Sequence, residues 1–177
     1  NQTEEDILNG MSPRLRNKIL KVQQTNYTIK PVNLDEKTLS ILVETYSTKG
    51  NSFPISIERL QKLVKTLNER NAIVFTGIFI QNELNAVLGL FYDVNTCYLI
   101  LNGLSSSTKT AGVNELLIYN GIQWAKNKGL QTFDFEGSMI SSIESFYRQF
   151  GGALTPYHKI WKESKQRKLR NLKQQLF

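Results

Sequence analysis

Apolar residues recur every three or four positions in the first part of the chain, which is the spacing of a helix with one buried face. The first clear helix is predicted to begin at Pro13, with Ser12 as its cap and Leu15, Ile19 and Val22 on its apolar stripe. The other elements expected here are a strand over residues 27–32, a helix from Asp35 to about Gly50 and a helix beginning at Ser56.

The pattern changes near residue 72 to runs rich in β-branched and aromatic residues. Three such runs cover residues 72–80, 84–94 and 97–104. They are joined by Gln81-Asn82-Glu83 and Asn95-Thr96, which are short turn sequences typical of hairpins. The sequence therefore predicts an antiparallel meander of three strands.

Helices and strands alternate after the meander. The expected elements are a polar loop at residues 105–112, a helix from Val113 to about Lys128, a strand over 131–135, a helix over about 142–150 and a strand near 155–161. This order indicates an α+β domain with a mixed central sheet and flanking helices, and not a doubly wound fold. We expect a single domain over residues 1–163 and a basic amphipathic helix over 164–177.

The net charge of +7 is concentrated at the end of the chain. Residues 162–177 hold six cationic side chains against Glu163 alone, so this segment contributes +5. A local excess does not favour nucleic-acid binding by the whole domain. For the tail, two hypotheses stay open: a lipid- or RNA-contacting helix, and a solvated amphipathic end docked on a neighbouring domain.

Cys97 is the only cysteine and His158 the only histidine. A disulfide within the chain is therefore excluded, and a metal site is not expected because its ligands are lacking. The apolar run around Cys97 favours a small buried residue over a nucleophile, and we expect a reducing, cytoplasmic location. No apolar run approaches the roughly 20 residues that a membrane span requires.

The polar loop before Val113 is the first candidate for chemistry. A helix start presents backbone N–H groups with a partial positive charge behind them, which suits a phosphate or pyrophosphate. Gly112 permits close approach to the backbone, and Lys109 can add a charge. The alternative, which the loop by itself favours, is a solvated segment capped by its own polar side chains.

Two carboxylates near the end of the next strand are the second candidate. Asp134 and Glu136 are two residues apart, so both are expected on one face of the strand. There they can orient an amine or act as a general base. The alternative is a structural ion pair with Arg148 or Lys159.

The last candidates are hydroxyl, guanidinium and imidazole groups near the end of the domain. Tyr147 and Arg148 lie off the apolar line of their predicted helix and can face a cleft. Tyr157 and His158 follow on the last predicted strand. A tyrosine can serve as a general acid, while a lone histidine is more often a structural hydrogen-bonding group.

Four blocks of the sequence together resemble a known family. They are MSPRLRNKILKVQQ, AIVFTGIFIQNELNAVLGLFYDVNTCYLILNGLSSST, GVNELLIYNGIQWAKNKGLQTFDFEGS and ESFYRQFGGALTPYHKIWK. Their order and spacing are similar to those of the FemABX-like, or BioF2-like (CelD-like), branch of the GNAT acetyltransferase superfamily. The resemblance extends over about residues 11 to 162.

This resemblance implies a GNAT fold and transfer of an acyl group to an amine, carried by a small molecule or a peptide. Some members take an aminoacyl group from charged tRNA in cell-wall bridge synthesis, which suggests a role in cell-envelope biogenesis, and other GNAT proteins use acyl-CoA. Two GNAT-like domains commonly lie in tandem in such proteins. The block at residue 11 resembles the start of the second one, so an upstream domain is expected.

The resemblance also implies roles for individual residues. Glu136 is the expected base and Tyr147 or Tyr157 the proton donor, with Asp134, Arg148 and His158 as substrate contacts. The donor arm would pair with the third meander strand and the pyrophosphate would rest on the following helix start. The residues implied for donor binding are Leu101, Asn102, Gly103, Leu104, Lys109, Thr110, Ala111, Gly112, Val113 and Asn114.

Two sequence differences keep the donor open. The loop at residues 109–114 has one glycine and no arginine, whereas CoA-using GNAT enzymes have Arg/Gln-x-x-Gly-x-Gly/Ala. Tyr147 stands where FemABX-like transferases often have lysine. A catalytically degenerate domain that only binds a donor or a partner is the alternative hypothesis.

Overall fold

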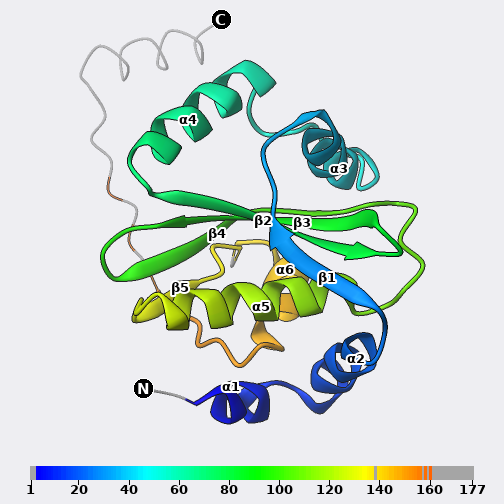
Figure 1. The fold of residues 1–177 in the computed structure, drawn as a ribbon. Coiled ribbons are helices and arrows are strands. Elements are labelled where there is room, and N and C mark those ends of the chain that lie inside the picture. Colours follow the sequence, from blue (N-terminus) through cyan, green and yellow to red (C-terminus); the bar gives the residue numbers. More distant parts are fainter. Residues whose placement is uncertain (1–2, 138, 157, 159, 161–177) are drawn as a thin grey trace, which may run out of the picture.

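The computed structural model describes residues 3–137, 139–156, 158 and 160. Its centre is a five-stranded sheet whose strands lie side by side in chain order (Figure 1). The strands are β1 (Tyr27–Pro31), β2 (Ile73–Ile80), β3 (Glu83–Tyr92), β4 (Thr96–Leu104) and β5 (Thr132–Asp134). Neighbours from β1 to β4 are antiparallel, whereas β4 and β5 are parallel. The predicted α+β class with a mixed sheet is thus confirmed.

Helices cover both faces of the sheet (Figure 1). On one face lie α3 (Glu36–Ser47) and α4 (Ile57–Glu69), and on the other α2 (Pro13–Gln23) and α5 (Val113–Asn127). Residues of α1 (Glu4–Gly10) and α6 (Ser141–Arg148) pack at the margin of the α2–α5 side. The sheet therefore separates two hydrophobic cores.

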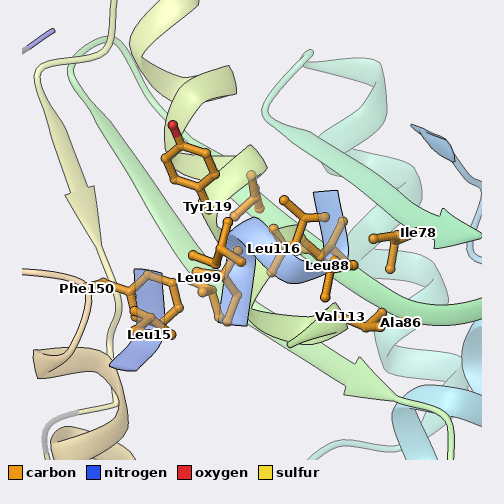
Figure 2. Packing of buried hydrophobic residues seen from close by; sticks show 14 of the residues in the cluster. Leu15, Ile78, Ala86, Leu88, Leu99, Val113, Leu116, Tyr119 and Phe150 are labelled. Carbon is orange, nitrogen blue, oxygen red and sulfur yellow. The ribbon is translucent and has the colours of Figure 1, made fainter. Parts of the chain in front are cut away.

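The core on the α5 side is where α2, α5 and β4 meet. Figure 2 shows Leu15, Leu99 and Leu116 pointing toward one another, with Phe150 beside Leu15. Leu15 is 1% exposed and Leu116 2%. Burial of each such side chain contributes about 1.5–3 kcal/mol. This packing fixes α2 against the start of α5.

Local sequence explains the helix boundaries. The side chains of Ser12, Asp35 and Ser56 each accept a hydrogen bond from the backbone N–H three residues later. The predicted cap at Ser12 and the predicted helix starts at Asp35 and Ser56 are thus confirmed. The first hairpin turn places Gln81 and Asn82 at positive φ, which matches the right-handed twist of the flanking strands.

The structure differs from the predictions at both ends of the chain. It adds α1, whose signature is a capping box between Thr3 and Asp6. The strand expected near residues 155–161 is wrong as far as it is described, because Thr155, Pro156, His158 and Ile160 lie in no strand. The predicted tail helix at 164–177 lies outside the described residues. Within the described ranges, no helix has the length and apolar character needed to cross a membrane.

Candidate functional site

The parallel strands β4 and β5 pair along only part of their length. Their partners are Thr96 with Thr132, Cys97 with Phe133, and Tyr98 with Asp134. β4 then continues to Leu104, and residues 99–104 pair with no described strand on that side. The sheet is therefore open beyond Tyr98, on an edge whose backbone groups can bind an extended ligand.

A β-bulge lies at the start of this open edge. Leu99 pairs with Leu90 and Leu101 with Gly89, so Ile100 is an extra residue on β4 that has no partner on β3. A bulge bends its strand and leaves the extra residue unpaired in the ladder. Ile100 is 39% exposed, although it lies within a sheet strand. The bulge thus coincides with the point where β4 and β5 separate.

Backbone direction decides which residues of β4 face the open edge. The N–H of Ser105 donates to the carbonyl oxygen of Asn85 on β3 at 2.8 Å. Because residues alternate in an antiparallel pair, Leu101 and Gly103 also bond toward β3, whereas Asn102 and Leu104 face outward. Among the residues predicted to hold a donor arm, two therefore present backbone groups to the edge.

Leu104 is already bonded by a threonine of α3. Its N–H donates to Thr45 Oγ1 at 2.9 Å, and its carbonyl oxygen accepts from the same hydroxyl at 3.2 Å. Gly103 permits this close approach of α3, because a Cβ there would lie 3.2 Å from the carbonyl oxygen of Ile41. Of the two outward-facing residues predicted to pair with the donor arm, Asn102 is thus the one whose backbone N–H and C=O are bonded by no described residue.

The serine part of the following loop is tied to its surroundings. Ser106 donates from its backbone N–H and its hydroxyl to the Glu44 carboxylate. These two hydrogen bonds hold the pKa of Glu44 below its ordinary value. The Thr108 hydroxyl donates to the carbonyl oxygen of Asn85 at 3.0 Å. A carboxylate therefore already occupies the Ser106 donors that an anionic ligand would use.

The second half of the loop retains its hydrogen-bonding capacity. The backbone N–H groups of residues 109–115 donate to no described residue, and no side chain caps α5. Gly112 is the N-cap, with φ of +95°. Lys109 and Ala111 are exposed, Thr110 and Asn114 are half-buried, and Gly112 and Val113 are buried. Such a helix start favours an anion.

A side-chain hydrogen bond connects the edge to the helix start. Asn102 Nδ2 donates to Asn114 Oδ1 at 2.8 Å. The predicted donor-binding residues on β4 and on the α5 start are therefore brought together, although they are separated by a loop in sequence. This side-chain contact is not predictable from the spacing of the two asparagines.

The two predicted carboxylates do not share a strand face. β5 ends at Asp134, and Glu136 has a φ of +61°, so the strand does not continue through it. The N–H of Glu136 instead donates to Asp134 Oδ1 at 2.8 Å. The expected same-face arrangement is wrong because this turn ends the alternation. Both side chains are exposed at the end of β5, beside the open edge.

Tyr147 is packed into an aromatic cluster at the end of β5. Its ring stacks on Phe135 with centroids 5.1 Å apart, and Phe146 is a further neighbour at 5.3 Å. Gly137 leaves room for the ring, because a Cβ there would lie 2.7 Å from Tyr147. Burial raises the pKa of Tyr147 to about 12 because it disfavours the phenolate. The hydroxyl is therefore protonated at neutral pH.

The remaining predicted site residues are dispersed. Arg148 bonds Glu144 one helical turn earlier, with Nη2 at 2.7 Å from Oε1, and not the β5 carboxylates. His158 is exposed, and Tyr157 lies outside the described residues. Cys97 is buried, and burial raises the pKa of its thiol to about 12, as expected of a core residue. The described residues contain no group of three or more His, Cys, Asp and Glu side chains placed to hold a metal ion.

Two surface grooves are lined mainly by parts of the molecule other than the outward face of β4. The larger, of about 1050 Å³, is lined by α1, the end of α5 and β5. The smaller, of about 590 Å³, lies between α3 and the Ser105 loop and includes Glu44. Neither contains a residue predicted to bind the donor, so volume alone does not locate the candidate site.

Comparison with known proteins identifies the domain. The family model described as "Acetyltransferase (GNAT) domain" matches residues 14–149, which is more than half of the chain. A search of curated proteins gave no match.

Solved structures give the same fold. FemX superposes with a TM-score of 0.73 at 11% identity, covering 85% of this chain and 56% of that chain. An acetyltransferase from Trypanosoma brucei gives 0.55 at 15% identity, covering 78% of this chain and 100% of that one. AAC(6')-Iy, in complex with a bisubstrate analogue containing CoA, gives a TM-score of 0.59 at 12% identity, covering 79% of this chain and 99% of that one. This chain thus spans little more than half the length of FemX. With the family-model match, these results show that the chain belongs to the GNAT acetyltransferase family.

Proposed function

We propose that the protein transfers an acyl group from a thioester donor of the acyl-CoA type to an amine. The observation that carries this proposal is the open edge of β4. It begins at the bulge of Ile100 and ends at the α5 start, where N–H groups donate to no described residue. An extended arm can pair with the outward backbone of Asn102 while its phosphates contact residues 109–111 and the start of α5. The CoA complex of AAC(6')-Iy supports this donor class.

The transfer replaces the thioester C–S bond by an amide C–N bond. The acceptor amine attacks the carbonyl carbon, loses one proton, and the departing sulfur gains one. Glu136 is exposed at the end of β5 and is the proposed base. Tyr147 is the proposed acid, because its hydroxyl is protonated at neutral pH and its ring stacks on Phe135 at the end of β5. Asp134 accepts from Glu136 N–H and thereby holds the turn that carries the base.

Removing a single backbone N–H tests the donor edge. Asn102→Pro deletes the outward N–H, and proline is tolerated on an edge because the deleted donor is not part of the β3 ladder. We expect it to weaken acetyl-CoA binding about tenfold, measured by titration calorimetry. Asn102→Ala is the matched control, since it also loses the Asn114 contact but keeps the N–H.

Equal weakening by both variants would contradict pairing through the Asn102 backbone. Absence of acetyl-CoA binding by the wild-type protein would contradict the acyl-CoA proposal as a whole. The remaining candidates would then be an aminoacyl-tRNA donor and a domain that only binds a partner.

Aminoacyl-tRNA is a second proposed donor, supported by the sequence blocks shared with FemABX-like proteins. Transfer of radioactive amino acid from charged tRNA to a peptide amine, without transfer from acetyl-CoA, would favour this donor. A role in the cell envelope and an upstream GNAT-like domain remain proposals from the same resemblance.

A further inference from the structure

Helix α2 packs its second half directly on the start of α5. A Cβ added at Gly112 would lie 2.8 Å from the carbonyl oxygen of Lys18 and 3.0 Å from Val22. From the same turn of α2, Lys18 Nζ bonds Glu115 Oε1 at 2.9 Å. A helix far away in sequence therefore delivers a cation to the first turn of α5.

Glu115 lies within the helix start to which we assign the donor phosphates. It is the acidic residue of the first turn and is only 9% exposed. A carboxylate there is favourable for the helix itself because it faces the positive end of the dipole. It is unfavourable for an anionic ligand on the same turn, and a buried charge is little screened by solvent.

Lys18 is the described residue that forms a salt bridge with this carboxylate. Its side chain remains 40% exposed, so the ammonium group reaches the surface beside the α5 start. The ion pair has no net charge, whereas Glu115 alone would add a negative charge close to the proposed phosphate site. The loop itself offers only Lys109 as a cation.

We propose that Lys18 is a positioning residue of the donor site, which neutralises Glu115 so that the start of α5 accepts the phosphates of the donor. The inference rests on the proposed acyl-CoA function. A purely structural ion pair would hold α2 on α5 and affect stability, but it would not distinguish donors with phosphates from donors without them. The role of Lys18 is therefore measurable separately from its effect on folding.

Four variants test the inference by their affinity for acetyl-CoA. Lys18→Met leaves Glu115 unpaired and is expected to weaken binding about tenfold, because an unneutralised carboxylate on the same helical turn repels the phosphates. Glu115→Gln removes the repulsion and is expected to bind as tightly as the wild type or more tightly. The double variant Lys18→Met/Glu115→Gln is expected to return within about threefold of the wild type. Lys21→Met, an equal charge change on the exposed side of α2, is the matched control and is expected to change affinity less than threefold.

A donor without phosphates distinguishes the neutralisation of Glu115 by Lys18 from a structural effect of the ion pair. S-acetyl-pantetheine, titrated by NMR chemical shifts, is expected to bind all four variants and the wild type equally. Thermal unfolding identifies any variant that fails to fold, and Glu115→Gln keeps the test decisive if Lys18→Met does not fold. Weaker acetyl-CoA binding by a folded Glu115→Gln, or an unrestored double variant, would overturn the role of Lys18.

Acetyl-CoA binding by the wild type and by Lys18→Met distinguishes an error in the proposed donor from an error in the role of Lys18. If the wild type binds no acetyl-CoA, the proposed donor is wrong. If the wild type binds it but Lys18→Met binds equally well, the donor stands and only the role of Lys18 is wrong.

Discussion

At the residue scale, the environment of each side chain decides its protonation. Tyr147 and Cys97 both have a pKa raised to about 12 because burial disfavours their anions. Cys97 is fully enclosed in the core, so its thiol has no access to a ligand. The Tyr147 ring instead stacks on Phe135 at the end of β5, and its hydroxyl keeps its proton at neutral pH.

The raised pKa of Tyr147 predicts a loss of stability in alkali. A phenol whose pKa is about 12 in the folded protein and about 10 when unfolded stabilises the fold fully below pH 10, and this contribution falls as pH rises toward 12. Tyr147→Phe keeps the stack on Phe135 but has no proton to lose. Its melting temperature should therefore fall less than that of the wild type between pH 9.5 and 11.5, followed by circular dichroism. Equal slopes of melting temperature against pH for the two proteins would show that the hydroxyl is not desolvated.

Tyr147→Phe also lacks the proposed acid, so its acetyl transfer at pH 8 should be at least about tenfold slower than that of the wild type.

At the element scale, the contact between α2 and α5 determines the shape of the candidate site. Ser12, Pro13 and the apolar stripe predict α2 from local sequence alone. Its place over the start of α5 depends on Gly112, whose positive φ and lack of a side chain permit the contact with Lys18. The bulge at Ile100 is likewise a property of two strands together, so neither strand predicts it alone.

Two glycine variants measure the α2–α5 contact. Gly112→Ala and Gly129→Ala both place alanine at positive φ, which costs about 1–2 kcal/mol. A Cβ at Gly129 would have no neighbour within 4 Å, whereas a Cβ at Gly112 would face a backbone carbonyl oxygen at 2.8 Å. Gly112→Ala should therefore lower the free energy of unfolding by at least about 1 kcal/mol more, measured in urea. Equal losses would mean that α2 can move away without cost.

At the scale of the whole molecule, the sheet is shared by two cores. Leu15 is buried on the α2–α5 side and Leu42 on the α3–α4 side. Because β4 contributes Leu99 to one core and Leu101 to the other, the loss of either core should destabilise the same strand. The molecule is therefore expected to unfold as one unit.

Truncation of either core tests this cooperativity. Leu15→Ala and Leu42→Ala should each cost about 2–5 kcal/mol, because both side chains are at most 1% exposed. Leu20→Ala is the control on α2, since Leu20 is 42% exposed and should change stability by less than about 1 kcal/mol. Fluorescence and circular dichroism should give coincident urea transitions for all three. Separate transitions in one variant would show that the cores unfold independently.

The sequence by itself determined the elements that depend on neighbours in the chain. Caps at Ser12, Asp35 and Ser56, apolar stripes and hairpin turns act over a few residues, so their patterns survive in any fold. The family resemblance added the GNAT fold with its mixed sheet. It also implied donor binding by Leu101 to Leu104 and by the α5 start, which stays a prediction, and it did not separate Asn102 from Leu104.

Only the tertiary structure decided how these elements combine into a candidate site. The bulge at Ile100, the bonding of Leu104 by Thr45 and the pairing of Lys18 with Glu115 join residues that are far apart in sequence. Each depends on register or packing, which a local pattern does not encode. The alternation of side chains along β5 does not reach Glu136, because the strand ends at Asp134 and Glu136 has a φ of +61°.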